Sequence, residues 1–203
     1  EDYTPQKKHD LRSVTKSITG ILMGIAIDQG YVRSIDDTVQ HYFKKDPRFD
    51  QHPTITIRHL MTMSTGLDCD DWSKTSKGQE DRVYKKRDWL GYFWNLPALR
   101  PPGEVAQYCT MGQVLAMELI QRASGMPIEV FAQQYLFDPL GINQVCWKHT
   151  SQRKDIIPAA KRLHLAPRDL AKIGQLILQK GQWNNQLIVA ADWVDTMTST
   201  HVS

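Results

Sequence analysis

The segment from Ser13 to Gly30 constrains the fold most, because its apolar residues would cover nearly every face of a helix. A helix that is apolar all round must be buried, so we expect it in the middle of the fold. Gly20 and Gly24 lie about one turn apart on it and would let another element approach closely. The apolar run is about half as long as a membrane-spanning helix requires, so no transmembrane segment is predicted.

The other periodic segments are also mostly helical, and strand signals are weak. Helices are expected after Ser34, with Asp37 completing a capping box, and over Ile55 to Ser64, Arg82 to Asn95, Thr110 to about Arg122 with Gln113 completing a second capping box, Pro127 to about Leu136, Pro167 to Gly181, and Ala190 to Met197. Weak strand candidates are Gln144 to Lys148 and Gln186 to Val189. By these patterns alone the chain is mostly helical.

Composition excludes several classes of protein. The chain has 203 residues, of which 41% are hydrophobic, enough for one globular domain with a buried core. Its net charge of +3 is too small and too interspersed to indicate a nucleic-acid or membrane-surface partner. The 3 cysteines form no C-x-x-C pair, so neither a complete disulfide framework nor a zinc ribbon is indicated. No H-E-x-x-H metal motif and no G-x-S-x-G nucleophile turn occurs, so no metal site is predicted.

Ser13 and Lys16 form an S-x-x-K motif at the start of the apolar segment. Residues three apart lie on one face of a helix, so the lysine amine can reach the serine oxygen. A serine hydroxyl becomes a useful nucleophile when a base accepts its proton, and a lysine serves as that base where burial or another cation lowers its pKa. Ser13 would also lie at the positive end of the helix, where free N–H groups favour an oxyanion. The second match, Ser151 to Lys154, lies in a polar run and is interpreted as a solvated loop.

Taken together, several motifs resemble those of the class C β-lactamase-like serine hydrolases, in the order that this family uses. They are Ser13-Val14-Thr15-Lys16-Ser17, Gly30-Tyr31, Ile35-Asp36-Asp37, Thr56 through Leu67, Pro102-Gly103-Glu104, Tyr108-Cys109-Thr110, Ser124-Gly125, and Ala166 through Ala171. The resemblance implies an α+β fold of the β-lactamase/DD-peptidase type. It also implies that residues 1–203 are part of such a domain, truncated at both ends, with mainly the helices present and most of the antiparallel sheet missing.

The resemblance implies that Ser13 is the acylated nucleophile, that Lys16 is its partner, and that Tyr108 is the tyrosine of the second motif. A phenol near an ammonium can share its proton, so either Lys16 or Tyr108 could be the base, and the sequence does not decide between them. Thr110 is a substrate-binding candidate. Aromatic residues of the loop and helix that overhang the site in relatives could line an apolar pocket, although core packing is their default interpretation: Trp72, Trp89, Tyr92 and Trp94. His164 is interpreted as a surface or cap-adjacent residue.

Two departures from the family pattern shape the expected function. Thr110 stands where the family often has Asn, which favours an esterase or amide hydrolase, including the branch resembling 6-aminohexanoate-dimer hydrolases, over an efficient β-lactamase. The third motif, Lys-Thr-Gly or His-x-Gly, does not follow the last helix, and Lys74-Thr75-Ser76 lies in the wrong order and context. Because that motif supplies an oxyanion N–H, we expect residues 1–203 alone to be catalytically weak and to expose an apolar face.

The expected function is therefore a serine hydrolase that forms an acyl-enzyme with an ester, amide, small peptide or β-lactam-type substrate. No cofactor and no nucleic acid is implied, the partner is a small molecule or short peptide, and the oligomeric state is open. The resemblance implies an exported bacterial protein. Two alternatives remain at this point: a non-catalytic relative that only binds ligands, and an unrelated helical interaction module in which Ser13 lies beyond about 5 Å from both Lys16 and Tyr108.

Overall fold

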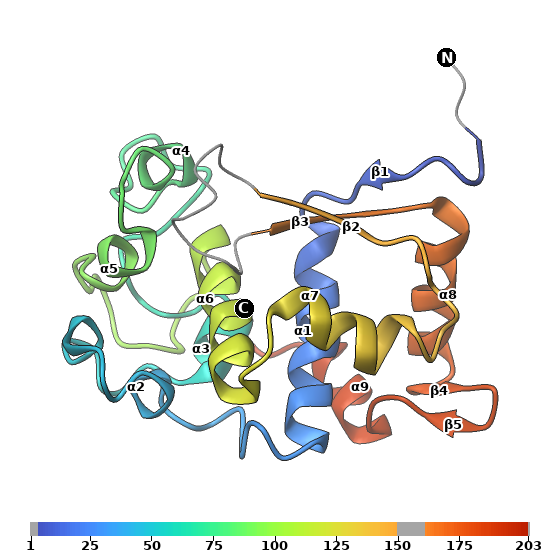
Figure 1. Cartoon of the computed structure of the whole chain (residues 1–203). Helices are drawn as coiled ribbons and strands as arrows, with labels where there is room; N and C mark the ends of the chain where they lie inside the picture. Colours follow the sequence, from blue (N-terminus) through green and yellow to red (C-terminus); the bar gives the residue numbers. More distant parts are fainter. Residues whose placement is uncertain (1–3, 150–160, 203) are drawn as a thin grey trace.

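The structure is a computed structural model that describes residues 4–149 and 161–202, and its fold is α+β, as predicted (Figure 1). The helices are α1 (Val14–Asp28), α2 (Val39–Tyr42), α3 (Ile57–Met61), α4 (Glu80–Val83), α5 (Trp89–Trp94), α6 (Thr110–Ser124), α7 (Ile128–Ala132), α8 (Pro167–Leu178) and α9 (Ala191–Met197). The strands are β1 (His9–Asp10), β2 (Cys146–His149), β3 (Lys161–Leu165), β4 (Gln182–Trp183) and β5 (Gln186–Leu187). The second S-x-x-K match, at Ser151 to Lys154, lies outside the described residues.

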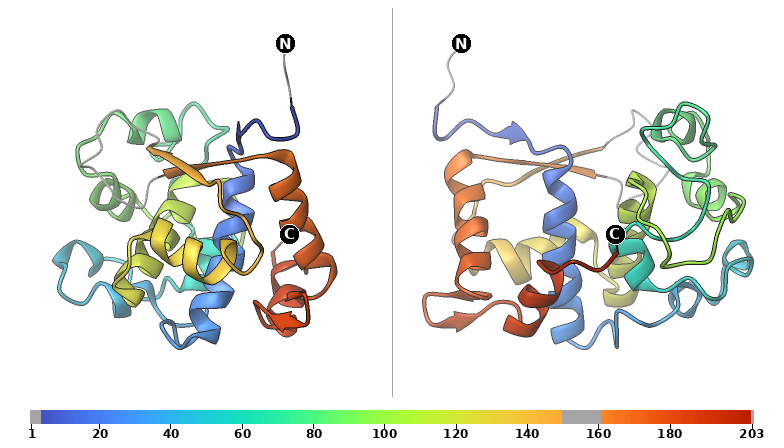
Figure 2. Two further views of the ribbon diagram at one scale, coloured as in Figure 1. Left: turned by 45° about the vertical axis from the view of Figure 1, so that its right-hand side comes forward. Right: turned by 180° about the vertical axis from the view of Figure 1, so that it is seen from behind.

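Helix α1 runs through the middle of the molecule, which confirms the prediction made from its apolar faces (Figure 2). Every residue from 18 to 26 is buried, and helices α6 and α9 pack against the helix. Gly125 ends α6 in the left-handed conformation, with φ of 71°. Within the described ranges no helix is long and apolar enough to cross a membrane.

The two glycines of α1 allow α9 to pack directly against its backbone, as predicted. The indole Nε1 of Trp193 donates a hydrogen bond to the carbonyl of Gly20, at 3.0 Å. A Cβ built on Gly24 would lie 2.1 Å from the Trp193 ring, whereas one built on Gly20 would lie 3.4 Å from the end of the Met197 side chain. Close packing therefore depends on Gly24 far more than on Gly20.

This difference gives a matched pair of substitutions. Gly24→Ala is expected to destabilise the protein by about 1–3 kcal/mol, because the Trp193 ring must move. Gly20→Ala is expected to be neutral or slightly stabilising, since its methyl group makes an ordinary contact and alanine favours a helix. Denaturant unfolding of both variants measures the effect, and equal stabilities would contradict the proposed role of Gly24.

A three-stranded antiparallel sheet, in the order β1-β3-β2, lies across the N-terminal end of α1 (Figure 1). The weak strand signals at β2 and β5 are confirmed, whereas β1, β3 and β4 gave no signal in the sequence. The backbone of Leu163 fixes the central strand to α1: its carbonyl accepts from Leu11 N–H at 2.9 Å, and its N–H donates to Thr15 Oγ1 at 3.4 Å. The sheet thereby reaches the residues on both sides of Ser13.

Several predicted helices are shorter than expected. The capping box predicted at Ser34 is wrong, because Ser34 Oγ accepts from Asp36 N–H in a turn and the helix begins only at Val39. The helix predicted from Arg82 to Asn95 is two helices, since the side chain of Asp88 caps a new one by accepting from Gly91 N–H at 2.9 Å. The segment Ile55 to Ser64 is helical only over Ile57–Met61. The helix after Pro127 is α-helical over Ile128–Ala132 and continues as a π-helix over Gln133–Phe137.

Cys69 and Cys109 form a disulfide, with 5.5 Å between their Cα atoms, and Cys146 is free. The odd cysteine count gave no indication of this pair, because the two residues are 40 positions apart and meet only through the packing of a loop against the start of α6. Both sulfur-bearing side chains are buried. The disulfide therefore joins the residue after Tyr108 to the loop that carries Trp72.

Candidate active site

The structure brings Ser13, Lys16 and Tyr108 together. Tyr108 Oη donates a hydrogen bond to Ser13 Oγ at 2.7 Å, although the two residues are 95 positions apart. Lys16 Nζ donates to the same oxygen at 3.3 Å, and it lies 5.0 Å from the centre of the Tyr108 ring. Because both distances to Ser13 are shorter than about 5 Å, the alternative of an unrelated helical module fails its own criterion.

Ser13 is the N-cap residue of α1, at the end of the helix where the helix dipole favours negative charge, and its side chain makes no capping hydrogen bond. The expectation that several N–H groups remain free there is wrong: those of Val14, Thr15 and Lys16 donate to the carbonyls of Leu11, Arg12 and Ser13, each at 3.0 Å. Among the described residues, the backbone N–H of Ser13 has no acceptor. It is therefore the N–H group of this turn that can stabilise a negative oxygen formed beside the serine.

The segment that carries Tyr108 is fixed on both sides. The carbonyl of Tyr108 accepts from Asp71 N–H at 2.8 Å, and Gln107 N–H donates to the carbonyl of Met63 at 2.9 Å. The disulfide at Cys109 adds a covalent link directly after the tyrosine. The phenol is thus held against Ser13 by backbone bonds and not only by its own hydroxyl.

Asp71, in the loop that also carries Trp72, organises this side of the site. Its carboxylate accepts from Thr110 N–H at 2.7 Å and from Glu80 N–H at 3.1 Å, so one side chain caps both α6 and α4. Burial raises the pKa of Asp71, while its hydrogen bonds from Thr110 oppose that shift. The capping box predicted for Thr110 and Gln113 is wrong, because Cys109 is the N-cap and Asp71 supplies the acceptor. Nothing in the sequence distinguished Asp71 from neighbouring loop residues.

The four aromatic candidates lie in different surroundings. Trp72 is 80% exposed, and its ring centre lies 5.7 Å from that of Tyr108, but Trp72 does not line the pocket beside Ser13. Trp89 and Trp94 are buried in the core, which confirms their interpretation as core-packing residues. Tyr92 donates its hydroxyl hydrogen bond to the carbonyl of Lys77.

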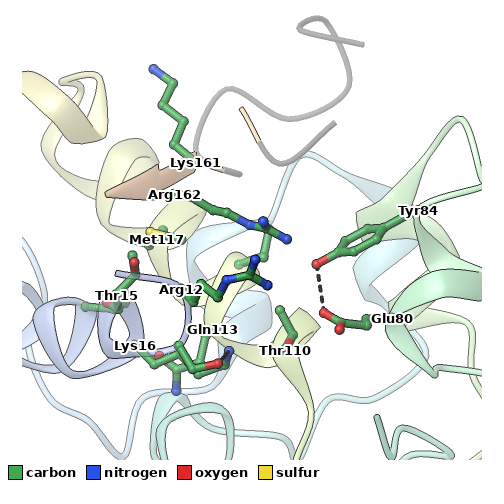
Figure 3. A pocket seen from close by; sticks show the side chains of 13 residues that line it. Arg12, Thr15, Lys16, Glu80, Tyr84, Thr110, Gln113, Met117, Lys161 and Arg162 are labelled. Carbon is green, nitrogen blue, oxygen red and sulfur yellow. Dashed lines mark hydrogen bonds between the residues drawn. The ribbon is translucent and has the colours of Figure 1, made fainter. Parts of the chain in front are cut away.

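A pocket of about 130 Å³ opens beside Ser13 between α1, α4, α6 and β3 (Figure 3). Thr110, a predicted substrate-binding residue, lines it together with Ser13 and Lys16. His164 lies on β3 but not in the pocket lining, and its ring nitrogen Nδ1 is 3.3 Å from the carbonyl of Arg162. A second hollow, of about 240 Å³, adjoins Lys16 on another side and is lined by both polar and apolar side chains.

The pocket walls carry charged side chains, most of which no sequence motif indicated. Arg12, Lys16 and Arg162 contribute positive charge, and Glu80 contributes a carboxylate that accepts from Tyr84 Oη at 3.0 Å. Burial raises the pKa of Tyr84, so its hydroxyl stays protonated and donates to Glu80. Among residues 4–149 and 161–202, no group of His, Cys, Asp or Glu side chains could hold a metal ion.

The central helix of the fold thus carries a serine at its N-terminus and a lysine one turn further on, and a tyrosine from a distant segment contacts the serine. The chain belongs to the Beta-lactamase family, whose model matches residues 1–198. Members of this superfamily are serine hydrolases that act on amides, esters or β-lactams.

Curated relatives support this placement. The chain is 29% identical to a β-lactamase of Escherichia coli (strain K12) over 140 residues, which cover 69% of this chain and 35% of that protein. It is 22% identical to the 6-aminohexanoate-dimer hydrolase of Paenarthrobacter ureafaciens over 203 residues, or 96% of this chain and 52% of that protein. The chain therefore spans about a third to a half of these relatives.

The fold also matches solved structures over almost the whole chain. The octameric penicillin-binding protein homologue from Pyrococcus abyssi superposes with a TM-score of 0.72 at 21% identity, covering 98% of this chain and 50% of that one. This likeness confirms the predicted β-lactamase/DD-peptidase-like architecture.

Proposed function

We propose that this protein is a serine hydrolase in which Ser13 is acylated, with Lys16 and Tyr108 exchanging its proton. The observation that carries the proposal is the convergence of Tyr108 Oη, at 2.7 Å, and Lys16 Nζ, at 3.3 Å, on one serine oxygen. These distances suit proton transfer from the hydroxyl to either group.

The reaction has two halves. In the first, Ser13 Oγ forms a bond to the substrate carbonyl carbon, the carbon bond to the leaving oxygen or nitrogen breaks, and the serine proton passes through the Lys16–Tyr108 pair to the leaving group. In the second, water adds to the acyl ester, its proton returns to Ser13, and the carboxylic acid is released. The N–H of Ser13 and the helix dipole stabilise the oxyanion in both halves.

We further propose that esters and amides are better substrates than β-lactams. Thr110 lines the pocket next to Lys16, and its short hydroxyl side chain offers no carboxamide donor at the second-motif position. The resemblance to a 6-aminohexanoate-dimer hydrolase, whose name describes a linear amide substrate, supports the same preference.

Covalent labelling tests the proposal directly. A fluorophosphonate ester is expected to add one adduct to the intact protein, on the peptide that contains Ser13, and Ser13→Ala is expected to lose it. Ser17→Ala, which removes an exposed hydroxyl one turn further along α1, serves as the matched control and should retain the adduct. Labelling that survives Ser13→Ala would refute the assignment, and an unlabelled native protein would favour the ligand-binding alternative. Covalent modification is the readout because it reports directly on the Ser13 nucleophile.

A further inference from the structure

We propose that the pocket beside Ser13 selects acyl chains that end in a carboxylate, which Arg12 and Arg162 bind. The inference rests on the proposed acylation of Ser13 and adds the chemical class of its substrate. Two guanidinium groups can bind one carboxylate through paired N–H donors, a geometry that neutral groups do not reproduce.

Arg12 immediately precedes the nucleophile and lines the pocket. Its φ of 45° lies in the left-handed region, where glycine is more stable than any residue with a side chain, and Asp10 holds that turn by accepting from Arg12 N–H at 2.9 Å. The guanidinium of Arg12 donates no hydrogen bond within the described part of the chain. Arg12 is exposed, and its charge acts on the nearby Asp10 without a hydrogen bond from the guanidinium, so the guanidinium donors can bind an anionic ligand beside Ser13.

Arg162 reaches the same pocket from β3. Antiparallel pairing with β1 places this strand against the residues that precede Ser13. Within the described residues, the only carboxylate that the Arg162 guanidinium contacts is that of Asp10, at 3.5 Å. This distance is too long for a strong charged hydrogen bond. In Figure 3 the guanidinium groups of Arg12 and Arg162 both extend toward the space in front of Tyr84 and Glu80.

The remaining charges leave the arginine side of the pocket available. Lys161, next to Arg162, forms an ion pair with Glu129, and Figure 3 shows its side chain extending away from the two arginines. On the opposite wall, the Glu80 carboxylate accepts a hydrogen bond from the Tyr84 hydroxyl. A volume of about 130 Å³ corresponds to roughly four water molecules, enough for about three methylene groups and a terminal carboxylate.

Three 4-nitrophenyl esters with the same three-methylene chain test this inference. They end in a carboxylate (the glutaric half-ester), a carboxamide, and a trimethylammonium group. The stoichiometric burst of 4-nitrophenolate gives the acylation rate, and the rate with the Ser13→Ala protein subtracts uncatalysed hydrolysis. We expect acylation by the carboxylate ester to be about tenfold or more faster than by the carboxamide, and the trimethylammonium ester to be slowest.

Arginine variants assign any preference to its residues. Arg12→Gln and Arg162→Gln are each expected to reduce the carboxylate-to-carboxamide ratio by about tenfold. Lys161→Gln removes a neighbouring positive charge that is already paired and should retain the ratio, and thermal unfolding identifies any variant that fails to fold. Equal acylation rates for the carboxylate and carboxamide esters would overturn the proposed carboxylate preference but not the proposed function. A carboxylate-to-carboxamide ratio that is unchanged in both arginine variants would do the same. If none of the three esters acylates the protein and the fluorophosphonate does not phosphonylate it, the proposed function would be refuted instead.

Discussion

Replacing Lys16 with methionine is expected to slow acylation of Ser13 by about 10²–10⁴-fold, the usual contribution of a positioned acid–base group. Methionine keeps most of the chain length and removes the amine that lies 3.3 Å from the serine oxygen. The burst rate with a neutral 4-nitrophenyl ester measures the effect. Lys44→Met, at an exposed position away from the pocket, is the control. Acylation of Lys16→Met at the native rate would exclude the lysine from the mechanism.

The companion variant Tyr108→Phe separates the two proton assignments that remain open. It removes the hydroxyl that lies 2.7 Å from Ser13 Oγ and leaves the ring that packs near Trp72. If the phenolate is the base, Tyr108→Phe should slow acylation as much as Lys16→Met does. If neutral Lys16 is the base, the effect should be much smaller. The same burst measurement distinguishes these outcomes.

Loss of the Cys69–Cys109 disulfide is expected to destabilise the protein by about 3–4 kcal/mol. The bond closes a loop of 40 positions, and the chain-entropy model gives a stabilisation of this size for such a loop. Denaturant unfolding of a Cys69→Ala/Cys109→Ala variant measures the difference. Because Cys109 directly follows Tyr108, this variant is also expected to acylate more slowly than the native protein.

Cys146→Ala is the matched control, since Cys146 is a free and half-buried cysteine on β2. It should leave the acylation rate unchanged and should cost much less stability than the double variant. A reducing agent should likewise lower the stability of the native protein and leave that of the double variant unchanged. Equal unfolding midpoints for the native protein and the double variant would contradict a stabilising role for the disulfide.

Helices with a strong apolar period were predictable because burial of one continuous surface dictates their position. Helix α1 and helices α6, α8 and α9 lie close to their predicted bounds. The bounds of short helices were not predictable, because several side chains can compete to cap the same backbone N–H group. Thr110 shows this: its N–H is capped by Asp71 from a loop 39 positions away, in place of the local capping box. The strand β3 gave no signal because its pairing with β1 and β2 comes from distant segments.

The sequence by itself determined the pairing of Ser13 with Lys16, because residues three apart on a helix share a face whatever surrounds them. It also placed α1 in the core, since a helix apolar on every side has no face for solvent. The family resemblance pointed to Tyr108, but only the tertiary structure decided where Tyr108 and Arg162 lie relative to the serine. Packing of the loop against α6 brings Tyr108 to the serine, and pairing of β3 with β1 brings Arg162 toward Arg12. Such contacts join segments far apart in the chain, so no local pattern encodes them.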